Sequence, residues 1–94
     1  MILPVRLTEE ALQEEAEAYL FYEEEAQDLR EQFLREVEMT LQKVAENQTH
    51  YSFSDSTKTI RNIALIKFPF VIIYEIKIDC IEVYHIHHTK KELK

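Results

Sequence analysis

The last third of the sequence contains three consecutive apolar segments with very short connections, and these constrain the fold most. Residues 59–67 and 70–77 are rich in isoleucine, and residues 80–88 form a third segment of strand-forming side chains. Pro69 precedes the second segment, where a proline fits because it cannot donate to a central ladder. Asp79 marks the second connection. Strands joined this closely pair antiparallel, so we predict a three-stranded meander.

Two helices are predicted before these strands. Thr8 is a good N-cap and is followed by two glutamates, so a helix is expected from there to about Glu25. A second helix is expected between Asp28 and Asn47. Residues at spacings of three and four give the first helix its expected buried stripe, which is Leu12, Ala16, Tyr19, Leu20 and Glu23. The second helix has a stronger stripe, which is Leu29, Phe33, Val37, Leu41 and Val44.

The remaining segments complete an α+β fold. Residues 2–7 are typical of a short strand, with Pro4 confining it to an edge or to its own start. Residues 48–57 are polar and are expected to form a loop. The element order is therefore β-α-α-β-β-β, in one domain over residues 1–94. A helical hairpin is expected to pack on one face of a small, mainly antiparallel sheet.

Composition excludes several classes of protein. The chain has no glycine, which rules out glycine-rich phosphate loops. Its one cysteine, Cys80, rules out an internal disulfide and a multi-cysteine zinc site, and we interpret it as a small buried hydrophobe. No uncharged apolar run approaches the ~18 residues of a membrane helix, and no secretory signal is apparent. We therefore expect a cytoplasmic protein with no membrane association.

Charge is distributed unevenly around a net value of −7. Residues 1–50 hold four basic and 13 acidic side chains, whereas residues 51–94 hold seven basic and five acidic ones. Overall acidity argues against tight non-specific binding of nucleic acid. The second half, with a net charge of +2 (seven minus five), still provides a face where an anion could bind.

The first predicted strand of the meander offers residues for either catalysis or binding. RNA cleavage without a metal requires a base, a cation for the transition state and an acid. Arg61 or Lys67 could supply the cation, and Tyr74 or His88 could transfer protons. If the strand is regular, one face carries Arg61, Ile63, Leu65 and Lys67. Such a strip could also dock an amphipathic partner segment, or could be ordinary solvated surface.

A histidine cluster near the C-terminus raises the question of a metal. By strand alternation, His85 and His87 should share a face with Ile81 and Val83, and His88 should point the other way. No cysteine or carboxylate pair completes a ligand set at a recognisable spacing. We therefore predict no metal site and no cofactor.

The whole series of segments resembles the RelE/ParE superfamily of toxins from bacterial toxin–antitoxin pairs, nearer its ParE-like plasmid-stabilisation branch. The resemblance covers nearly the whole chain in the expected order. The segments that carry it are 17–24 (EAYLFYEE), 33–38 (FLREVE), 45–47 (AEN), 60–61 (IR), 67–74 (KFPFVIIY) and 88–91 (HTKK).

The resemblance implies a small toxin that is neutralised by a co-expressed antitoxin, which would wrap it with an extended or helical segment. RelE-like members cleave mRNA on the ribosome without a metal, whereas ParE-like members poison DNA gyrase. The positions that match the family's functional residues are Arg61, Lys67, Tyr74, His88 and Lys91.

Several positions depart from the family pattern. Lys91 stands where an arginine is usual, Ile73 replaces the first tyrosine of a pair, and the chain is acidic where relatives are basic. These departures favour binding of a protein target over RNA cleavage. The sequence is compatible with three functions: a gyrase-type toxin, a RelE-like endoribonuclease, and a non-toxic interaction module with the toxin fold. A homodimer is compatible with each.

Overall fold

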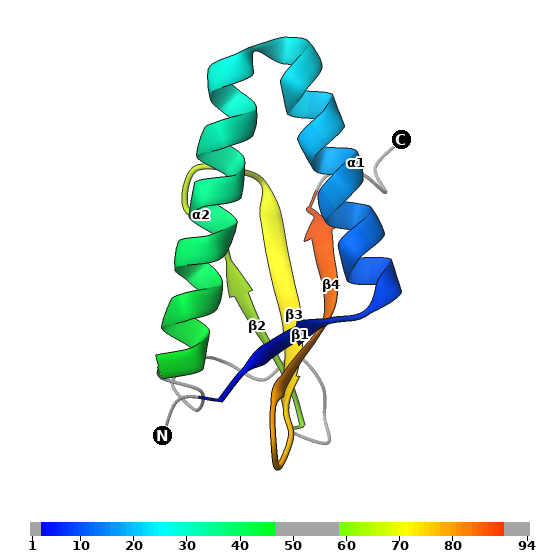
Figure 1. Cartoon of the computed structure of the whole chain (residues 1–94), viewed down its shortest axis with the longest axis vertical. Coiled ribbons are helices and arrows are strands. Elements are labelled where there is room, and N and C mark those ends of the chain that lie inside the picture. The colour runs from blue at the N-terminus through cyan, green and yellow to red at the C-terminus, as the bar shows by residue number, and fades with distance from the viewer. Residues whose placement is uncertain (1–2, 47–58, 90–94) are drawn as a thin grey trace.

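A computed structural model describes residues 3–46 and 59–89 (Figure 1). Its elements are β1 (Val5–Leu7), α1 (Glu9–Glu25), α2 (Gln27–Glu46), β2 (Ile60–Ala64), β3 (Phe70–Ile76) and β4 (Ile81–His88). The predicted β-α-α-β-β-β order is confirmed. The two helices form a hairpin over one face of the sheet, so the fold is α+β with two layers (Figure 1).

The sheet is mixed but mainly antiparallel, with strand order β1-β4-β3-β2. The predicted meander is present, because β3 pairs antiparallel with both β2 and β4. The N-terminal strand β1 adds to the outer edge of β4 in parallel, from Val5 opposite Ile81 to Leu7 opposite Val83. No helix in the described part of the chain is long and apolar enough to cross a membrane.

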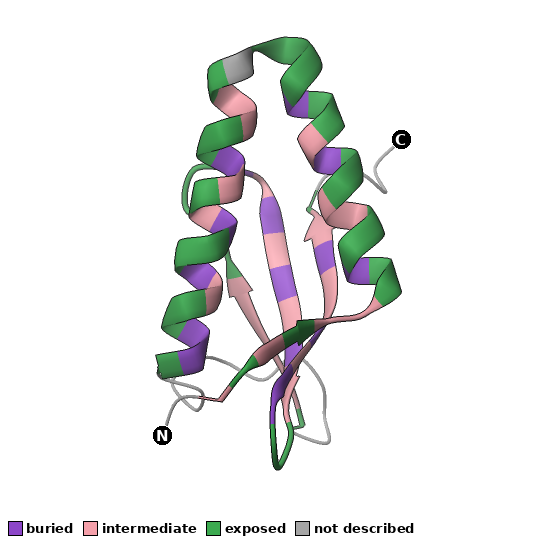
Figure 2. Cartoon of the chain, viewed as in Figure 1, coloured by how far each residue is buried: buried purple, intermediate pink, exposed green. Residues whose placement is uncertain are grey.

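The core lies between the helices and the sheet, as the buried positions in Figure 2 show. An aromatic cluster forms one end of it: the Phe33 ring centroid lies 5.1 to 5.5 Å from those of Tyr22, Phe68 and Phe70. Tilted and edge-to-face rings of this kind add about 0.5–1.5 kcal/mol per pair beyond the area that they bury. The fully buried strand residues are Ile72, Tyr74, Ile81, Val83 and Ile86.

The stripe predicted for α2 is confirmed, because Phe33, Val37 and Val44 have no exposed surface and the two leucines pack against the core. The stripe predicted for α1 is wrong. Its buried residues are Ala11, Ala18 and Tyr22, whereas Leu12 and Leu20 are 53% and 58% exposed. Two alanines on the inner face leave little side-chain volume between α1 and the sheet, and a pattern ranked by hydrophobicity selects the leucines instead.

A β-bulge in β4 places His85 and His87 on the opposite face of the sheet from Ile81 and Val83. Ile73 lies opposite His85 but Tyr74 lies opposite Val83, so Tyr84 has no partner across the β3–β4 ladder. The extra residue reverses the alternation. His85 and His87 share a face with each other and His88 points the other way, as predicted. The prediction that Ile81 and Val83 lie on the face of His85 and His87 is wrong, because the buried residue after the bulge is Ile86.

Candidate functional site

Arg61 and Ile63 lie on the helix side of the sheet. Arg61 is directly opposite Tyr74, and Ile63 is opposite Ile72, and both of these partners are fully buried in the core. Directly opposite residues in an antiparallel pair project from the same face. Both β2 side chains are accordingly half-buried, and Ile63 packs against the core cluster.

The predicted strip of Arg61, Ile63, Leu65 and Lys67 is not one continuous strand face. Strand β2 ends at Ala64, so strand geometry does not fix the last two positions. Leu65 turns into the core and is only 6% exposed, whereas Lys67 is exposed in the turn between β2 and β3. A hydrogen bond of 2.9 Å from the Leu65 N–H to the Phe70 carbonyl closes this turn.

The residues suggested for RNA cleavage do not converge. The side chain of Tyr74 is fully buried, and His88 is half-buried with its ring centroid 4.8 Å from that of Phe70. Arg61 lies opposite Tyr74 on one side of β3, and His88 lies opposite Phe70 on the other side. Arg61 and His88 are therefore two strands apart across the sheet and four residues apart along it, which separates their Cα atoms by roughly 16 Å. The fifth candidate, Lys91, lies outside the described residues.

A groove between α2 and the β2–β3 turn is the most distinctive described surface. The Glu36 carboxylate fixes one wall, because it accepts hydrogen bonds from the backbone N–H groups of Ile66 and Lys67. The groove encloses about 180 Å³. Its lining residues are Gln32, Arg35, Glu36, Met39, Thr40, Lys43, Ile66 and Lys67.

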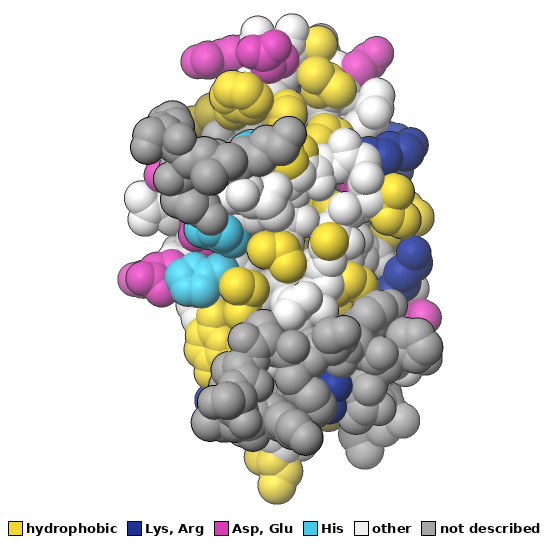
Figure 3. Space-filling view, turned by 180° about the vertical axis from the view of Figure 1, so that it is seen from behind, with side chains coloured by type: hydrophobic (Ala, Val, Ile, Leu, Met, Phe, Trp, Pro, Cys, Tyr) yellow, Lys and Arg dark blue, Asp and Glu magenta, His cyan; other side chains and the backbone are white. Residues whose placement is uncertain are grey.

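Exposed apolar and basic side chains occur together in this groove. Met39 is 53% exposed and Ile66 is 83% exposed, which is high for large apolar residues. Three cations, Arg35, Lys43 and Lys67, line the groove beside them, and none of the three is in an ion pair within the described part of the chain. Figure 3 shows basic and hydrophobic side chains along the α2 edge of the molecule. The described basic residues are Arg6, Arg30, Arg35, Lys43, Arg61, Lys67 and Lys77.

Sequence reasoning identified only Lys67 of this groove. A signal was present in α2, where Arg35, Met39 and Lys43 recur at a spacing of four. Residues at this spacing follow one another along a single helix face. That face is separate from the buried stripe of α2, so the hydrophobic pattern that identifies the core does not include it.

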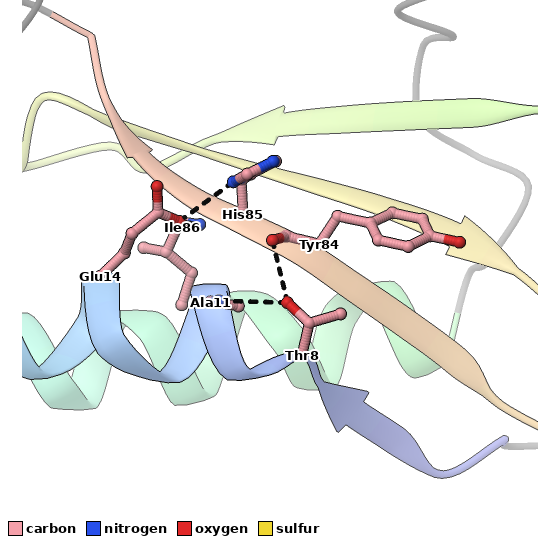
Figure 4. Close-up of polar contacts among 6 residues, drawn as sticks. All are labelled: Thr8, Ala11, Glu14, Tyr84, His85 and Ile86. Atoms are coloured by element: carbon pink, nitrogen blue, oxygen red, sulfur yellow. Dashed lines mark hydrogen bonds and ion pairs between the residues drawn. The ribbon is translucent and has the colours of Figure 1, made fainter.

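At the other edge of the sheet, the start of α1 contacts the part of β4 that lies beyond the end of β1 (Figure 4). The Thr8 N–H donates to the Val83 carbonyl at 3.0 Å, and the Thr8 hydroxyl donates to the Tyr84 carbonyl at 3.1 Å. Further along, Glu14 Oε1 accepts the Ile86 N–H at 2.9 Å and lies 3.3 Å from His85 Nδ1. These contacts cover part of the β4 edge that β1 leaves unpaired, which reduces its tendency to aggregate.

Two glutamates oppose each other at the far end of β3 and β4, where Glu75 faces Glu82. Lys77 Nζ lies 3.9 Å from Glu75 and 3.3 Å from Glu82, and the Tyr84 hydroxyl donates to Glu75 at 2.6 Å. Hydrogen bonds to Glu82 and Tyr84 raise the pKa of Lys77, and the bond to Glu75 raises the pKa of Tyr84. Lys77 and the Tyr84 hydroxyl offset part of the repulsion between the two facing carboxylates, so this network supports the structure of the β3–β4 end.

The sheet face turned away from the helices carries half-buried apolar side chains with histidines beside them (Figure 3). Val71 and Ile73 contribute from β3. Among residues 3–46 and 59–89, no group of three or more histidine, cysteine or carboxylate side chains is placed to hold a metal ion.

Comparison with known proteins gives one family and one fold. Residues 5–93 match the model of the family described as "ParE toxin of type II toxin-antitoxin system, parDE". No curated protein sequence matches the chain significantly. A solved structure titled "Chromosomal ParDE TA system from P. aeruginosa" superposes with a TM-score of 0.79 at 12% identity, over 93% of this chain and 96% of that one. At this identity the structural likeness establishes the fold.

Proposed function

We propose that this chain, which belongs to the ParE toxin family of type II toxin–antitoxin systems, acts in the cytoplasm as the toxin of such a pair. It inhibits growth by binding a protein target of the DNA gyrase type, and a ParD-type antitoxin holds it inactive.

The observation that carries the proposal is the burial of Tyr74, which has no exposed surface. A proton-transfer group must come within hydrogen-bond reach of the atom that it serves, either directly or through one water. The Tyr74 hydroxyl lies inside the core, on the helix side of the sheet. Together with the separation of Arg61 from His88, this favours a toxin that binds its target over one that cleaves RNA.

Charge also supports a protein target. The exposed faces of α1 are rich in glutamate, and the net charge of the chain is −7. A polyanion such as mRNA would be repelled by this field, because nucleic-acid affinity depends largely on neutralising phosphates with basic side chains.

The experiment is induction of the chain alone and together with the candidate antitoxin, which is the product of a small reading frame sought beside its own gene and is called the neighbouring gene's product below. We expect growth arrest with a DNA-damage response and intact mRNA, and we expect co-expression of the neighbour to restore growth. Cleavage of mRNA in an extract containing ribosomes would instead identify a RelE-like nuclease. Normal growth on induction would identify a non-toxic interaction module.

A further inference from the structure

The groove beside α2 has a regular pattern of charge. Arg35, Met39 and Lys43 follow at intervals of four residues, and an α-helix rises 1.5 Å per residue. Met39 is therefore about 6 Å along the helix axis from each cation. An apolar contact lies between two positive charges, one helical turn to either side.

The opposite wall of the groove also combines an exposed apolar side chain with a cation. Ile66 is exposed and Lys67 follows it, and the Glu36 carboxylate holds the backbone of both against α2. Because the Glu36 carboxylate is engaged by two N–H groups, the side chains of Ile66 and Lys67 are left to form the wall. The net charge of the lining is +2, from three cations and one carboxylate.

This surface stands out in a protein of net charge −7, because three of the seven basic side chains in the described part of the chain line one groove. Clustering of like charges costs energy, although solvent screens it. The cluster is thus complementary to an acidic ligand with an apolar centre. Amphipathic helices bind such grooves by inserting anchor side chains at regular spacings.

We propose that this groove binds an acidic amphipathic helix of the antitoxin. One large apolar side chain of that helix inserts between Met39 and Ile66, and carboxylates one turn before and after it pair with the cations of the groove. This inference rests on the proposed function and adds the chemistry of the partner segment. A second copy of the chain is a poorer occupant, because inserting α1 of one copy into this groove of another is a heterologous contact that need not close.

The test measures the affinity of the purified chain for the purified product of the neighbouring gene by calorimetry at low and high salt. Lys43→Glu should weaken binding at least tenfold at low salt. Arg6→Glu is the matched control, because Arg6 is an exposed cation on β1 outside the groove, and it should change the affinity less than twofold. Lys67→Glu provides a second groove variant on the opposite wall, and circular dichroism verifies the fold of each.

Three results would overturn the inference, and they are distinguishable. If the neighbour binds the wild type but both groove variants bind equally well, the groove is not the docking site and the proposed function stands. If the neighbour does not bind the wild type, both the inference and the proposed antitoxin partner fail. If Lys43→Glu leaves antitoxin affinity unchanged but abolishes self-association in sedimentation velocity, a second copy occupies the groove.

Discussion

Glu36 and Lys67 lie 31 residues apart in the sequence, yet the Glu36 carboxylate accepts the backbone N–H of Lys67 at 3.1 and 3.2 Å. The neighbouring Ile66 N–H donates to the same carboxylate. This contact joins the turn between β2 and β3 to the middle of α2. It fixes the separation of the two groove walls and so the position of the exposed Ile66 and Lys67 side chains.

Replacing Glu36 with alanine should loosen the turn. A hydrogen bond to a charged group contributes about 1.5–3 kcal/mol when desolvated, and water replaces part of that here, so we expect a loss of about 1 kcal/mol in the free energy of unfolding. Urea denaturation measures it. Glu31→Ala, at an exposed position of the same helix, should lose less than half as much. Equal losses for the two variants would mean that the carboxylate does not hold the turn.

Removal of the Thr8 hydroxyl should destabilise the protein at the opposite edge of the sheet. Its hydroxyl oxygen accepts the Ala11 N–H at 3.1 Å, which caps α1, and donates to the Tyr84 carbonyl (Figure 4). Thr8→Ala should cost about 1–2 kcal/mol in thermal or urea unfolding. Thr8→Ser keeps the hydroxyl and should retain most of the stability. A serine variant as unstable as the alanine variant would assign the effect to the methyl group.

The Glu15 carboxyl should make the free energy of unfolding depend on pH. Burial, and secondly the nearby Glu38 carboxylate, raise the pKa of Glu15 above 4.5. The ionised form of Glu15 is therefore disfavoured in the folded state, so this carboxylate lowers the free energy of unfolding at neutral pH. That destabilisation decreases as the pH falls through the raised pKa, and it is absent below the ordinary value. Glu15→Gln should stabilise the protein at pH 7 by a few tenths of a kcal/mol, after allowance for solvent screening, and should have no effect near pH 3.

Melting curves at several pH values measure this dependence, with the exposed Glu31→Gln as the control of equal charge change. A gain at pH 7 that persists unchanged near pH 3 would show that removal of the Glu15 charge is not its cause.

Tyr74 separates a binding toxin from a nuclease. Because the side chain is fully buried, Tyr74→Phe should arrest growth as strongly as the wild type. Tyr74→Ala should destabilise the core by about 3–5 kcal/mol and abolish toxicity through unfolding. Growth curves and denaturation of both variants test this. A folded Tyr74→Phe protein without toxicity would point to a chemical role for the hydroxyl.

The sequence predicted element order well, because each element has a strong local signal. The spacing of Phe33, Val37 and Val44 identifies the buried face of α2 directly. Such signals failed where tertiary geometry decided the outcome. The buried face of α1 depends on how closely Ala11 and Ala18 let it approach the sheet, and a preference for large apolar residues selects Leu12 instead.

The candidate site was less predictable than the fold. Alternation from Arg61 to Lys67 presumes a strand that continues past Ala64, but β2 ends there. Leu65 still lies on the core side, whereas Lys67 is exposed in the turn. The bulge opposite the Ile73–Tyr74 step has no sequence signal and reassigns the faces of the histidines. The contact of Glu36 with Lys67 spans two elements, so no local pattern in the sequence predicts it.

The central claim is that this ParE-family protein acts by binding a gyrase-type target. The most direct measurement is the supercoiling activity of purified DNA gyrase, titrated with the purified chain. We predict inhibition that depends on the concentration of the chain and is relieved by stoichiometric addition of the neighbouring gene's product. Unchanged supercoiling, with cleavage of mRNA by the same preparation in a translation extract, would contradict the account.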